Sequence, residues 1–309
     1  MPQVQSVLVI GAASLDRKGH ITGPVVPGAS NPGIVRRSLG GVARNVAENL
    51  AHLGVSVSLM TAIGDDPAGQ EVRREARNVG IDTSNILVVD GERTGAYLAI
   101  LDSTGALHVA VDDMAVLEAI TPRYLHDRRR LIAEAAMVVA DANLTPAALE
   151  TLFAIAAKNN VHVCADPTSP LLAARLRPHI VQLALTTPNA AEAGALSGLS
   201  IEDDEDALRV ARYLVSVGVG LAVVTLGESG LAYATSEESG RFPAIRAEVV
   251  DLTGAGDALT AGVIFGLLND LEPVEAVRLG LSAATLTLKC PETVCPDLSL
   301  EKLYDQLVV

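Results

Sequence analysis

Short apolar runs alternate along the chain with stretches in which apolar residues recur every three or four positions. A short aliphatic run is typical of a strand that is buried on both faces of a parallel sheet. We predict such strands at residues 7–11, 55–62, 137–140, 161–165, 183–186 and 221–225. Between several of these strands, residues are spaced three or four positions apart, as on one face of a helix. The three sets are Val42, Val46, Leu50 and Leu53; Leu149, Leu152, Phe153 and Ala156; and Leu208, Ala211, Arg212 and Val215. The alternation predicts an α/β fold with a mainly parallel central sheet and helices on both faces.

Two segments, approximately 17–38 and 92–113, break this alternation. Residues 96–111 form two apolar arms around Asp102-Ser103-Thr104-Gly105, which predicts a β-hairpin with a glycine-containing turn. The stretch 21–38 is rich in Gly and Pro and has no helical period. We predict that both segments form a small β lid, and that residues 1–309 make up one domain that carries it.

Composition narrows the classes of function. The chain has 23 Lys and Arg against 37 Asp and Glu, a formal charge of −14, which disfavours a nucleic-acid or anionic-membrane surface. No apolar run reaches the roughly 20 residues that a membrane span needs. The polar start Pro2-Gln3 predicts no signal peptide, and we expect a cytoplasmic protein.

The chain has three cysteines, Cys164, Cys290 and Cys295. An odd number of cysteines does not predict a disulfide framework. Cys290 and Cys295 have the spacing of half a metal site, but no second pair accompanies them. We therefore expect no disulfide and no zinc.

Polar residues follow several of the predicted strands. They are Asp16, Asp141, Asn143, Asp166, Asn189 and Gly227. Ligands of open parallel sheets bind outside the carboxyl ends of the strands, so these groups are expected to converge on one crevice. Each of them alone also suits a turn or a helix cap.

Thr253-Gly254-Ala255-Gly256 precedes a long apolar helix and is followed at once by Asp257. The start of a helix offers unpaired N–H groups, and glycine lets an anion approach them, so the stretch predicts an anion cradle. Asp257 is then either a favourable partner of the helix dipole or a general base beside the cradle. The chain has no Walker A motif, and Gly254-Ala255-Gly256 lacks the third glycine of the dinucleotide fingerprint.

A second glycine pair, Gly40-Gly41, precedes an amphipathic helix that carries Asn45 in its first turn. The pair allows a substrate to touch the backbone, and Asn45 would hydrogen-bond a vicinal diol. The other interpretation is a flexible helix entry with an asparagine in water.

The two glycine motifs together resemble the two signatures of the ribokinase-like (PfkB) carbohydrate kinase family. Further landmarks of that family match in order: Gly64-Asp65-Asp66-x-x-Gly69, Asp166-Pro167, Asn189-x-x-Glu192 and Thr225-x-Gly227-x-x-Gly230. The resemblance covers essentially the whole chain. It implies a three-layer α/β/α fold with a small β lid, and phosphoryl transfer from ATP to an alcohol.

The resemblance also implies roles for matching residues. Asp257 is expected to be the general base, and Gly254, Ala255 and Gly256 the anion hole. The sugar is expected to contact Asp16, Gly40, Gly41, Asn45 and Asn143. Asn189 would position phosphate, with Glu192 holding Mg²⁺ through water, and Thr225, Gly227 and Gly230 would bind the nucleotide. Asp251 and Thr253 match a loop that binds K⁺ in many members. Asp65-Asp66 is expected to cap a helix.

Within the family, three stretches are most similar to the pseudouridine kinases: Ser30-Asn31-Pro32-Gly33, residues 40–54 and Cys295-Pro296-Asp297-Leu298-Ser299. This implies pseudouridine as the substrate, with Ser30, Asn31, Thr94 and Asp113 near the uracil, although short polar residues here also suit turns. Asp112 departs from the family, where an Asn is common. The alternatives are a kinase for uridine, adenosine or ribose, and a non-catalytic nucleoside-binding protein. The resemblance also implies a homodimer through the lid.

Overall fold

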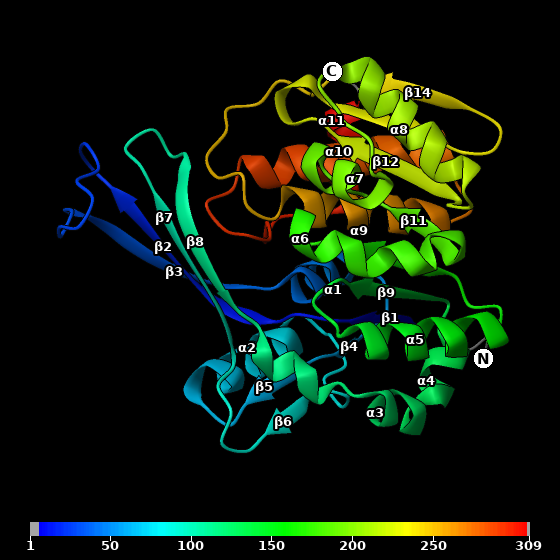
Figure 1. The fold of residues 1–309 in the computed structure, drawn as a ribbon, viewed down its shortest axis with the longest axis horizontal. Helices are drawn as coiled ribbons and strands as arrows, with labels where there is room; N and C mark the ends of the chain where they lie inside the picture. Colours follow the sequence, from blue (N-terminus) through cyan, green and yellow to red (C-terminus); the bar gives the residue numbers. More distant parts are fainter. Residues whose placement is uncertain (1–5, 308–309) are drawn as a thin grey trace.

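The structure, a computed structural model, describes residues 6–307. Residues 1–5, on which the expected lack of a signal peptide rests, lie outside the described residues. A large sheet crosses the molecule in the order β14-β13-β12-β11-β10-β9-β1-β4 (Figure 1). Its strands are β1 (Val7–Ile10), β4 (Val57–Met60), β9 (Met137–Asp141), β10 (Val163–Asp166), β11 (Leu183–Thr186), β12 (Leu221–Thr225), β13 (Leu231–Ala234) and β14 (Ser239–Phe242). Every pair from β12 to β4 is parallel, and β13 and β14 run antiparallel at one edge.

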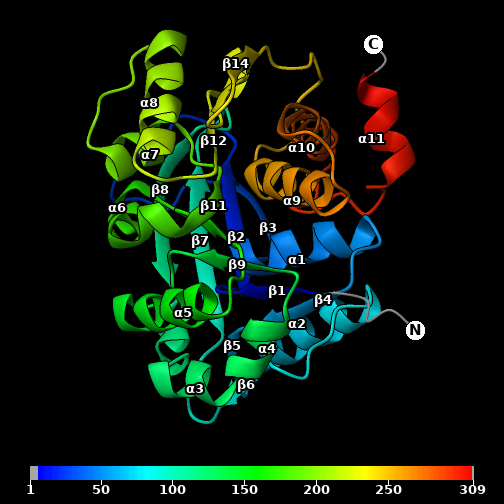
Figure 2. The same cartoon turned by 90° about the vertical axis from the view of Figure 1, so that its right-hand side faces the viewer.

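Helices cover both faces of the large sheet (Figure 2). One layer holds α1 (Val42–His52), α2 (Pro67–Asn78), α9 (Ala255–Leu268), α10 (Pro273–Leu288) and α11 (Leu300–Leu307). The other holds α3 (Pro122–Asp127), α4 (Arg129–Glu134), α5 (Pro146–Lys158), α6 (Pro170–Ala173), α7 (Ala190–Ser197) and α8 (Asp204–Ser216), with the short helices η1 (Ala115–Ala119) and η2 (Ala174–Gln182). A third short helix, η3 (Gly227–Ser229), forms the turn between β12 and β13.

Strand β1 shows why its sequence is apolar throughout. Leu8 and Ile10 pack with the helices of one layer, whereas Val7 and Val9 pack with those of the other. Successive side chains of a strand point to opposite faces, so a strand between two helix layers needs apolar residues at every position. The predicted three-layer α/β/α architecture is confirmed.

A four-stranded sheet, which we call the small sheet, protrudes from the body (Figure 1). Its order is β3-β2-β7-β8, with β2 (Ser14–Ile21), β3 (Gly33–Gly40), β7 (Gly95–Leu101) and β8 (Leu107–Asp113). The predicted hairpin is β7–β8, with Gly105 at φ +87° in its turn. The predicted strand 55–62 was wrong in extent: after Met60 the chain leaves the large sheet, and β5 (Ala62–Gly64) pairs with β6 (Leu87–Val89) instead.

The register of the small sheet separates its two faces. Ser38, Asp16, Tyr97 and Asp112 form one row, and Arg36, Lys18, Ala99 and Ala110 form the next row on the same face, which we call the inner face. The opposite, outer face carries Val35, Gly19, Ile100 and Val109 in one row, and Arg37, Arg17, Leu98 and Val111 in another. The inner face is thus rich in charge, whereas the outer face is largely aliphatic.

The expectation of no disulfide was wrong. Cys290 and Cys295 form a disulfide across the short loop after α10, with their Cα atoms 5.6 Å apart. The odd count misled because the third cysteine, Cys164, is buried in the large sheet and takes no part. Within residues 6–307, we find no helix that is both long and apolar enough to span a membrane.

Candidate active site

Helix α9 begins with an open first turn. Gly254 precedes it at φ +82°, and a Cβ there would collide with the carbonyl oxygen of Thr293, so only glycine fits. The first amides of a helix have no intrahelical partner, and in the part of the chain described no side chain caps those of α9. A Cβ at Gly256 would meet no atom within 4 Å outside its own turn of helix, so the space beside Gly256 is open. The predicted anion cradle therefore has the geometry to receive an anion.

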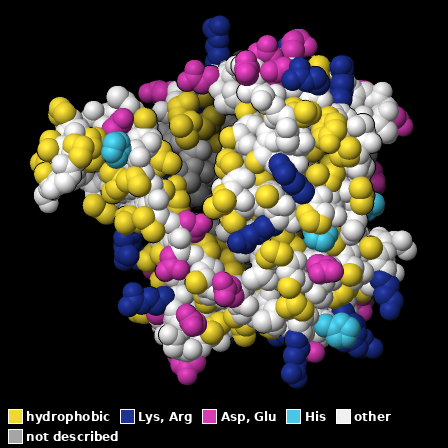
Figure 3. All heavy atoms as spheres, in the orientation of Figure 1, with side chains coloured by type: hydrophobic (Ala, Val, Ile, Leu, Met, Phe, Trp, Pro, Cys, Tyr) yellow, Lys and Arg dark blue, Asp and Glu magenta, His cyan; other side chains and the backbone are white. Residues whose placement is uncertain are grey.

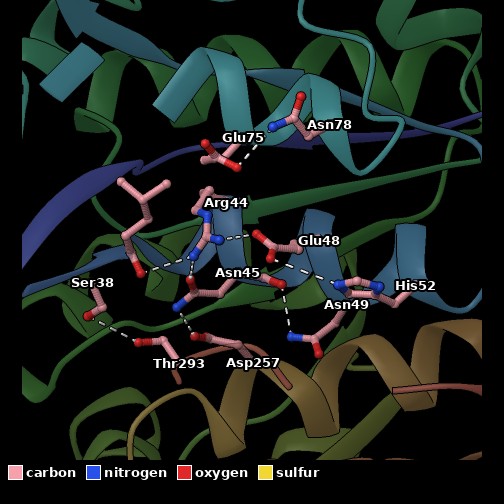
Figure 4. Close-up of polar contacts among 11 residues, drawn as sticks. Ser38, Arg44, Asn45, Glu48, Asn49, His52, Glu75, Asn78, Asp257 and Thr293 are labelled. Carbon is pink, nitrogen blue, oxygen red and sulfur yellow. Dashed lines mark hydrogen bonds and ion pairs between the residues drawn. The ribbon is translucent and has the colours of Figure 1, made fainter. Parts of the chain in front are cut away.

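Asp257 lies in the first turn of α9 and faces the first turn of α1 (Figure 4). The Nδ2 of Asn45 donates to its Oδ2 at 2.7 Å. The Nη1 of Arg44 donates to Asn45 Oδ1 at 2.9 Å and to the carbonyl of Leu39 at 3.0 Å. Because Arg44 holds the amide oxygen, the amide nitrogen of Asn45 is the end that faces the carboxylate.

The surroundings of Asp257 set its protonation. Burial raises its pKa to about 7, and the charges of Asp141 and Asp16 act in the same direction. The hydrogen bond from Asn45 and the charge of Arg44 oppose this rise in pKa. Arg44 itself is buried and pairs with Glu48. A carboxyl group with a pKa near neutrality suits a general base, because it is substantially ionised yet can hold a proton.

Asp16 and the glycine pair Gly40-Gly41 fit together closely. Asp16 is buried on β2 and accepts a hydrogen bond from Ser14 Oγ at 2.6 Å. A Cβ at Gly40 would collide with the Asp16 carboxylate, and Gly41, at φ +92°, has the carbonyl of Ala12 at the same point. The pair therefore makes room for the carboxylate and for the chain entering α1.

Several of the strand-end residues lie close to one another. Asp141 ends β9 and accepts hydrogen bonds from the amides of Ala12 at 2.7 Å and Ala43 at 3.2 Å, which ties three segments together. Asn143 donates its Nδ2 to Asp141 at 3.0 Å. Asp166 lies close enough that its pKa is raised well above the usual value, first by burial and then by Asp257 and Glu192. Four acidic side chains, Asp141, Asp166, Glu192 and Asp257, are therefore near enough for their charges to act on one another.

Asn189 and Glu192 begin α7 with a reciprocal capping box. The Asn189 amide donates to Glu192 Oε2 at 2.9 Å, and the Glu192 amide donates to Asn189 Oδ1 at 3.0 Å. The amide of Thr225 donates to the carbonyl of Pro188 at 2.9 Å, which brings the turn that begins at Thr225 beside this cap. Gly227 has open space around it, whereas a Cβ at Gly230 would collide with the carbonyl of Phe242.

The residues described above are compatible with only one way of binding Mg²⁺. Over residues 6–307 there is no group of three or more His, Cys, Asp or Glu side chains that could hold a metal ion. Glu192 has one carboxylate oxygen engaged in the cap, and burial raises its pKa. The donor set therefore fits a Mg²⁺ that arrives on nucleotide phosphates and keeps its water, not one held in a protein cage.

The loop Asp251–Thr253 does not fit a bound K⁺. Both carboxylate oxygens of Asp251 and the hydroxyl of Thr253 are engaged by the ammonium of Lys18. The oxygen atoms that the family resemblance assigned to a cation are therefore already paired with the positive charge of Lys18, which comes from the small sheet.

The residues expected near a base have local partners. Thr94 donates its hydroxyl to Asp66 Oδ1 at 2.6 Å and accepts from the amide of Gly64 at 3.0 Å. Asn31 closes its own loop through hydrogen bonds with Val26 and Ala29. Ser30 and Asp113 are exposed. Contacts of these four residues with a base stay predictions.

The structure adds residues that sequence reasoning missed, and it settles the expected cap. Asp66 caps α2 and accepts from the amide of Gly69 at 2.8 Å, as expected. Arg44 and Lys18 were missed. The spacing of Arg44 and Glu48 on one helix signals an ion pair, and Lys18 follows Asp16 at the two-residue period of one strand face.

The comparisons with known proteins decide the family. The model of the pfkB family of carbohydrate kinases matches residues 4–298. The protein is a pfkB family carbohydrate kinase. The kinase is 36% identical over 301 residues to pseudouridine kinase of Escherichia coli (strain K12), covering 97% of this chain and 96% of that protein. It is 28% identical to guanosine-inosine kinase of Exiguobacterium acetylicum, covering 94% and 96% of the two chains.

Solved structures show the same fold. The kinase superposes on the ribokinase of Arabidopsis thaliana complexed with ribose and ATP, with a TM-score of 0.84, 22% identity, and coverage of 99% of this chain and 100% of that chain. At this identity the likeness concerns the fold. Family membership makes the protein a phosphotransferase, a kinase of a carbohydrate or nucleoside.

Proposed function

We propose that this kinase phosphorylates the 5′-hydroxyl of pseudouridine with ATP, giving pseudouridine 5′-phosphate and ADP. The observation that carries the proposal is the position of Asp257, which lies in the first turn of α9 beside open amides and is held by Asn45 at 2.7 Å. A base and an anion-binding turn on the same helix end are what transfer of a phosphoryl group to an alcohol needs.

In the proposed step, the 5′-oxygen forms a bond to the γ-phosphorus while the bond between that phosphorus and the ADP oxygen breaks. The hydroxyl proton passes to Asp257, and the electron pair of the broken bond stays with ADP. Asp257 then releases its proton to water. Its pKa of about 7 allows both transfers near neutral pH.

The other residues take supporting roles in this proposal. The amides of Gly254, Ala255 and Gly256 stabilise charge on the transferred phosphate. Asp16, Asn45 and the Gly40-Gly41 backbone hold the ribose hydroxyls. Thr225, Gly227 and Gly230 form the turn that receives the nucleotide. Mg²⁺ bound to the ATP phosphates would neutralise their charge, with Asn189 and Glu192 around its water shell.

The choice of pseudouridine rests on the 36% identity to the Escherichia coli enzyme and on the stretches of this chain that resemble pseudouridine kinases. Pseudouridine carries a ring N–H that uridine lacks, and a site that hydrogen-bonds such a group rejects the analogue strongly. A purine nucleoside is the second candidate, because guanosine-inosine kinase matches over nearly the same length.

A substrate panel tests the proposal. The kinase is assayed with ATP and Mg²⁺ against pseudouridine, uridine, adenosine, guanosine, inosine and ribose, with ADP release and phosphorylated product both measured. We expect the highest kcat/KM for pseudouridine. A higher kcat/KM for another acceptor would reject this substrate and retain the kinase. Absence of turnover with every acceptor, combined with nucleoside binding by calorimetry, would favour the non-catalytic alternative.

We also propose that two copies pair through the outer face of the small sheet. Val35 and Val111 on that face are 71% and 60% exposed, and Leu98 and Val109 lie beside them. Figure 3 shows hydrophobic side chains gathered on the protruding lobe. A protruding sheet with an exposed aliphatic face favours association with a complementary surface, and an identical sheet offers one.

A further inference from the structure

Lys18 joins the small sheet to the loop that precedes the anion cradle. It lies on β2 two residues after Asp16, so both side chains occupy the inner face. Its Nζ donates to Asp251 Oδ1 at 3.1 Å and to Oδ2 at 2.9 Å, and it also hydrogen-bonds Thr253 Oγ1. The side chains of Lys18 and Asp251 are 14% and 29% exposed, so the ion pair is largely shielded from water.

Both carboxylate oxygens of Asp251 accept hydrogen bonds. Besides Lys18, the amide of Thr253 donates to Asp251 Oδ1 at 2.8 Å. Burial by itself would raise the pKa of Asp251, but the hydrogen bonds from Lys18 and Thr253 lower it overall, so the carboxylate stays charged. Thr253 directly precedes Gly254, whose left-handed φ aims the chain into α9. A charge that fixes Asp251 and Thr253 therefore also fixes the entry to the cradle.

We propose that the Lys18 ammonium supplies from within the chain the positive charge that a monovalent cation would otherwise bring to this loop, and that phosphoryl transfer by this kinase therefore needs no K⁺. An ammonium group and K⁺ are both single positive charges that carboxylate and hydroxyl oxygens can surround. Lys18 is a positioning residue, because it acts through Asp251 and Thr253 on the adjoining amides. The inference rests on the proposed function in that those amides receive the transferred phosphate.

The test compares cations at constant ionic strength. Turnover of wild type, with whichever acceptor the substrate panel identifies, is measured in K⁺, Na⁺ and tetramethylammonium, the last being too large to enter the loop. We expect the three rates to agree within about two-fold. Lys18→Met should lose at least about ten-fold in kcat in tetramethylammonium, because it leaves a shielded carboxylate without its partner, and K⁺ should restore much of the loss saturably.

A second readout needs no substrate. Thermal unfolding of Lys18→Met should shift to higher temperature as K⁺ replaces tetramethylammonium, because an ion that binds only the folded state stabilises it. Wild type and Arg17→Met should show no such shift. Arg17 is the matched control, since it is the neighbouring cation on the outer face of the same strand.

Three results would overturn the inference. They are strong stimulation of wild type by K⁺, a K⁺-dependent thermal shift in wild type, and a Lys18→Met variant that is indifferent to cations in both readouts. Failure of the substrate panel leaves the thermal readout intact, so failure of the proposed function and failure of this inference remain distinguishable.

Discussion

The Nδ2 of Asn45, in the first turn of α1, lies 2.7 Å from the Oδ2 of Asp257, in the first turn of α9. The two residues are 212 positions apart in the chain. Their contact joins the helix that follows Gly40-Gly41 to the helix that follows Gly254, so the carboxylate lies between the first turns of the two helices.

Asp257→Asn should lower kcat by at least about 100-fold, because an amide cannot accept the hydroxyl proton. Nucleoside affinity, measured by calorimetry, should change little, since the side chain keeps its shape. Asp127→Asn, an exposed aspartate on α3, is the matched control and should keep full activity. Near-native turnover in Asp257→Asn would remove Asp257 from the role of base.

The two glycines of the cradle should separate folding from catalysis. Gly254→Ala places a Cβ against the Thr293 carbonyl at φ +82°, so it should destabilise the protein by about 1–3 kcal/mol in thermal unfolding. The new methyl group of Gly256→Ala meets no atom within 4 Å outside its own turn of helix, so this variant should unfold at or above the wild-type temperature. Its kcat should nevertheless fall, because the methyl group enters the space for the phosphate. A fully active Gly256→Ala variant would contradict the cradle.

The pH dependence of kcat/KM should report the ionisation of Asp257. Its pKa is about 7, and only the ionised form accepts a proton, so activity should rise with pH through about 7 and then level off. Arg44 lowers this pKa. Arg44→Met should therefore move the acidic limb to higher pH, by roughly half a unit or more. Arg77→Met, whose guanidinium bonds to Thr83 outside the site, should leave the limb in place. A limb that shifts to lower pH in Arg44→Met would contradict this arrangement.

Light scattering at micromolar concentration should give the mass of a dimer. The double variant Val35→Lys and Val111→Lys should give a monomer with an unchanged circular dichroism spectrum, because facing charges would have to be buried together. Val181→Lys, an exposed valine in η2, is the control and should remain dimeric. A wild-type monomer, or a dimer that survives the double substitution, would remove the outer face from the interface.

The sequence by itself determined the layered fold and the local backbone conformation of the two glycine motifs. The strand at Val7–Ile10 is apolar at every position, as expected for a sheet that is covered on both faces. In the helical segments, apolar residues recur every three or four positions instead. The need for glycine at positions 41 and 254 could be predicted from the sequence, because it reflects a local constraint: the positive φ angle of each residue disfavours any other amino acid.

Only the tertiary structure decided which charges meet. Arg44 holds the amide of Asn45 so that its nitrogen faces Asp257, and Lys18 crosses from the small sheet to Asp251, 233 positions away. The tertiary structure also showed the disulfide between Cys290 and Cys295, which the odd number of cysteines had not suggested. Hydrophobic periodicity depends on residues that are close in the sequence. An ion pair depends instead on how separate elements pack, and a local sequence pattern does not predict the distance between the two charged groups.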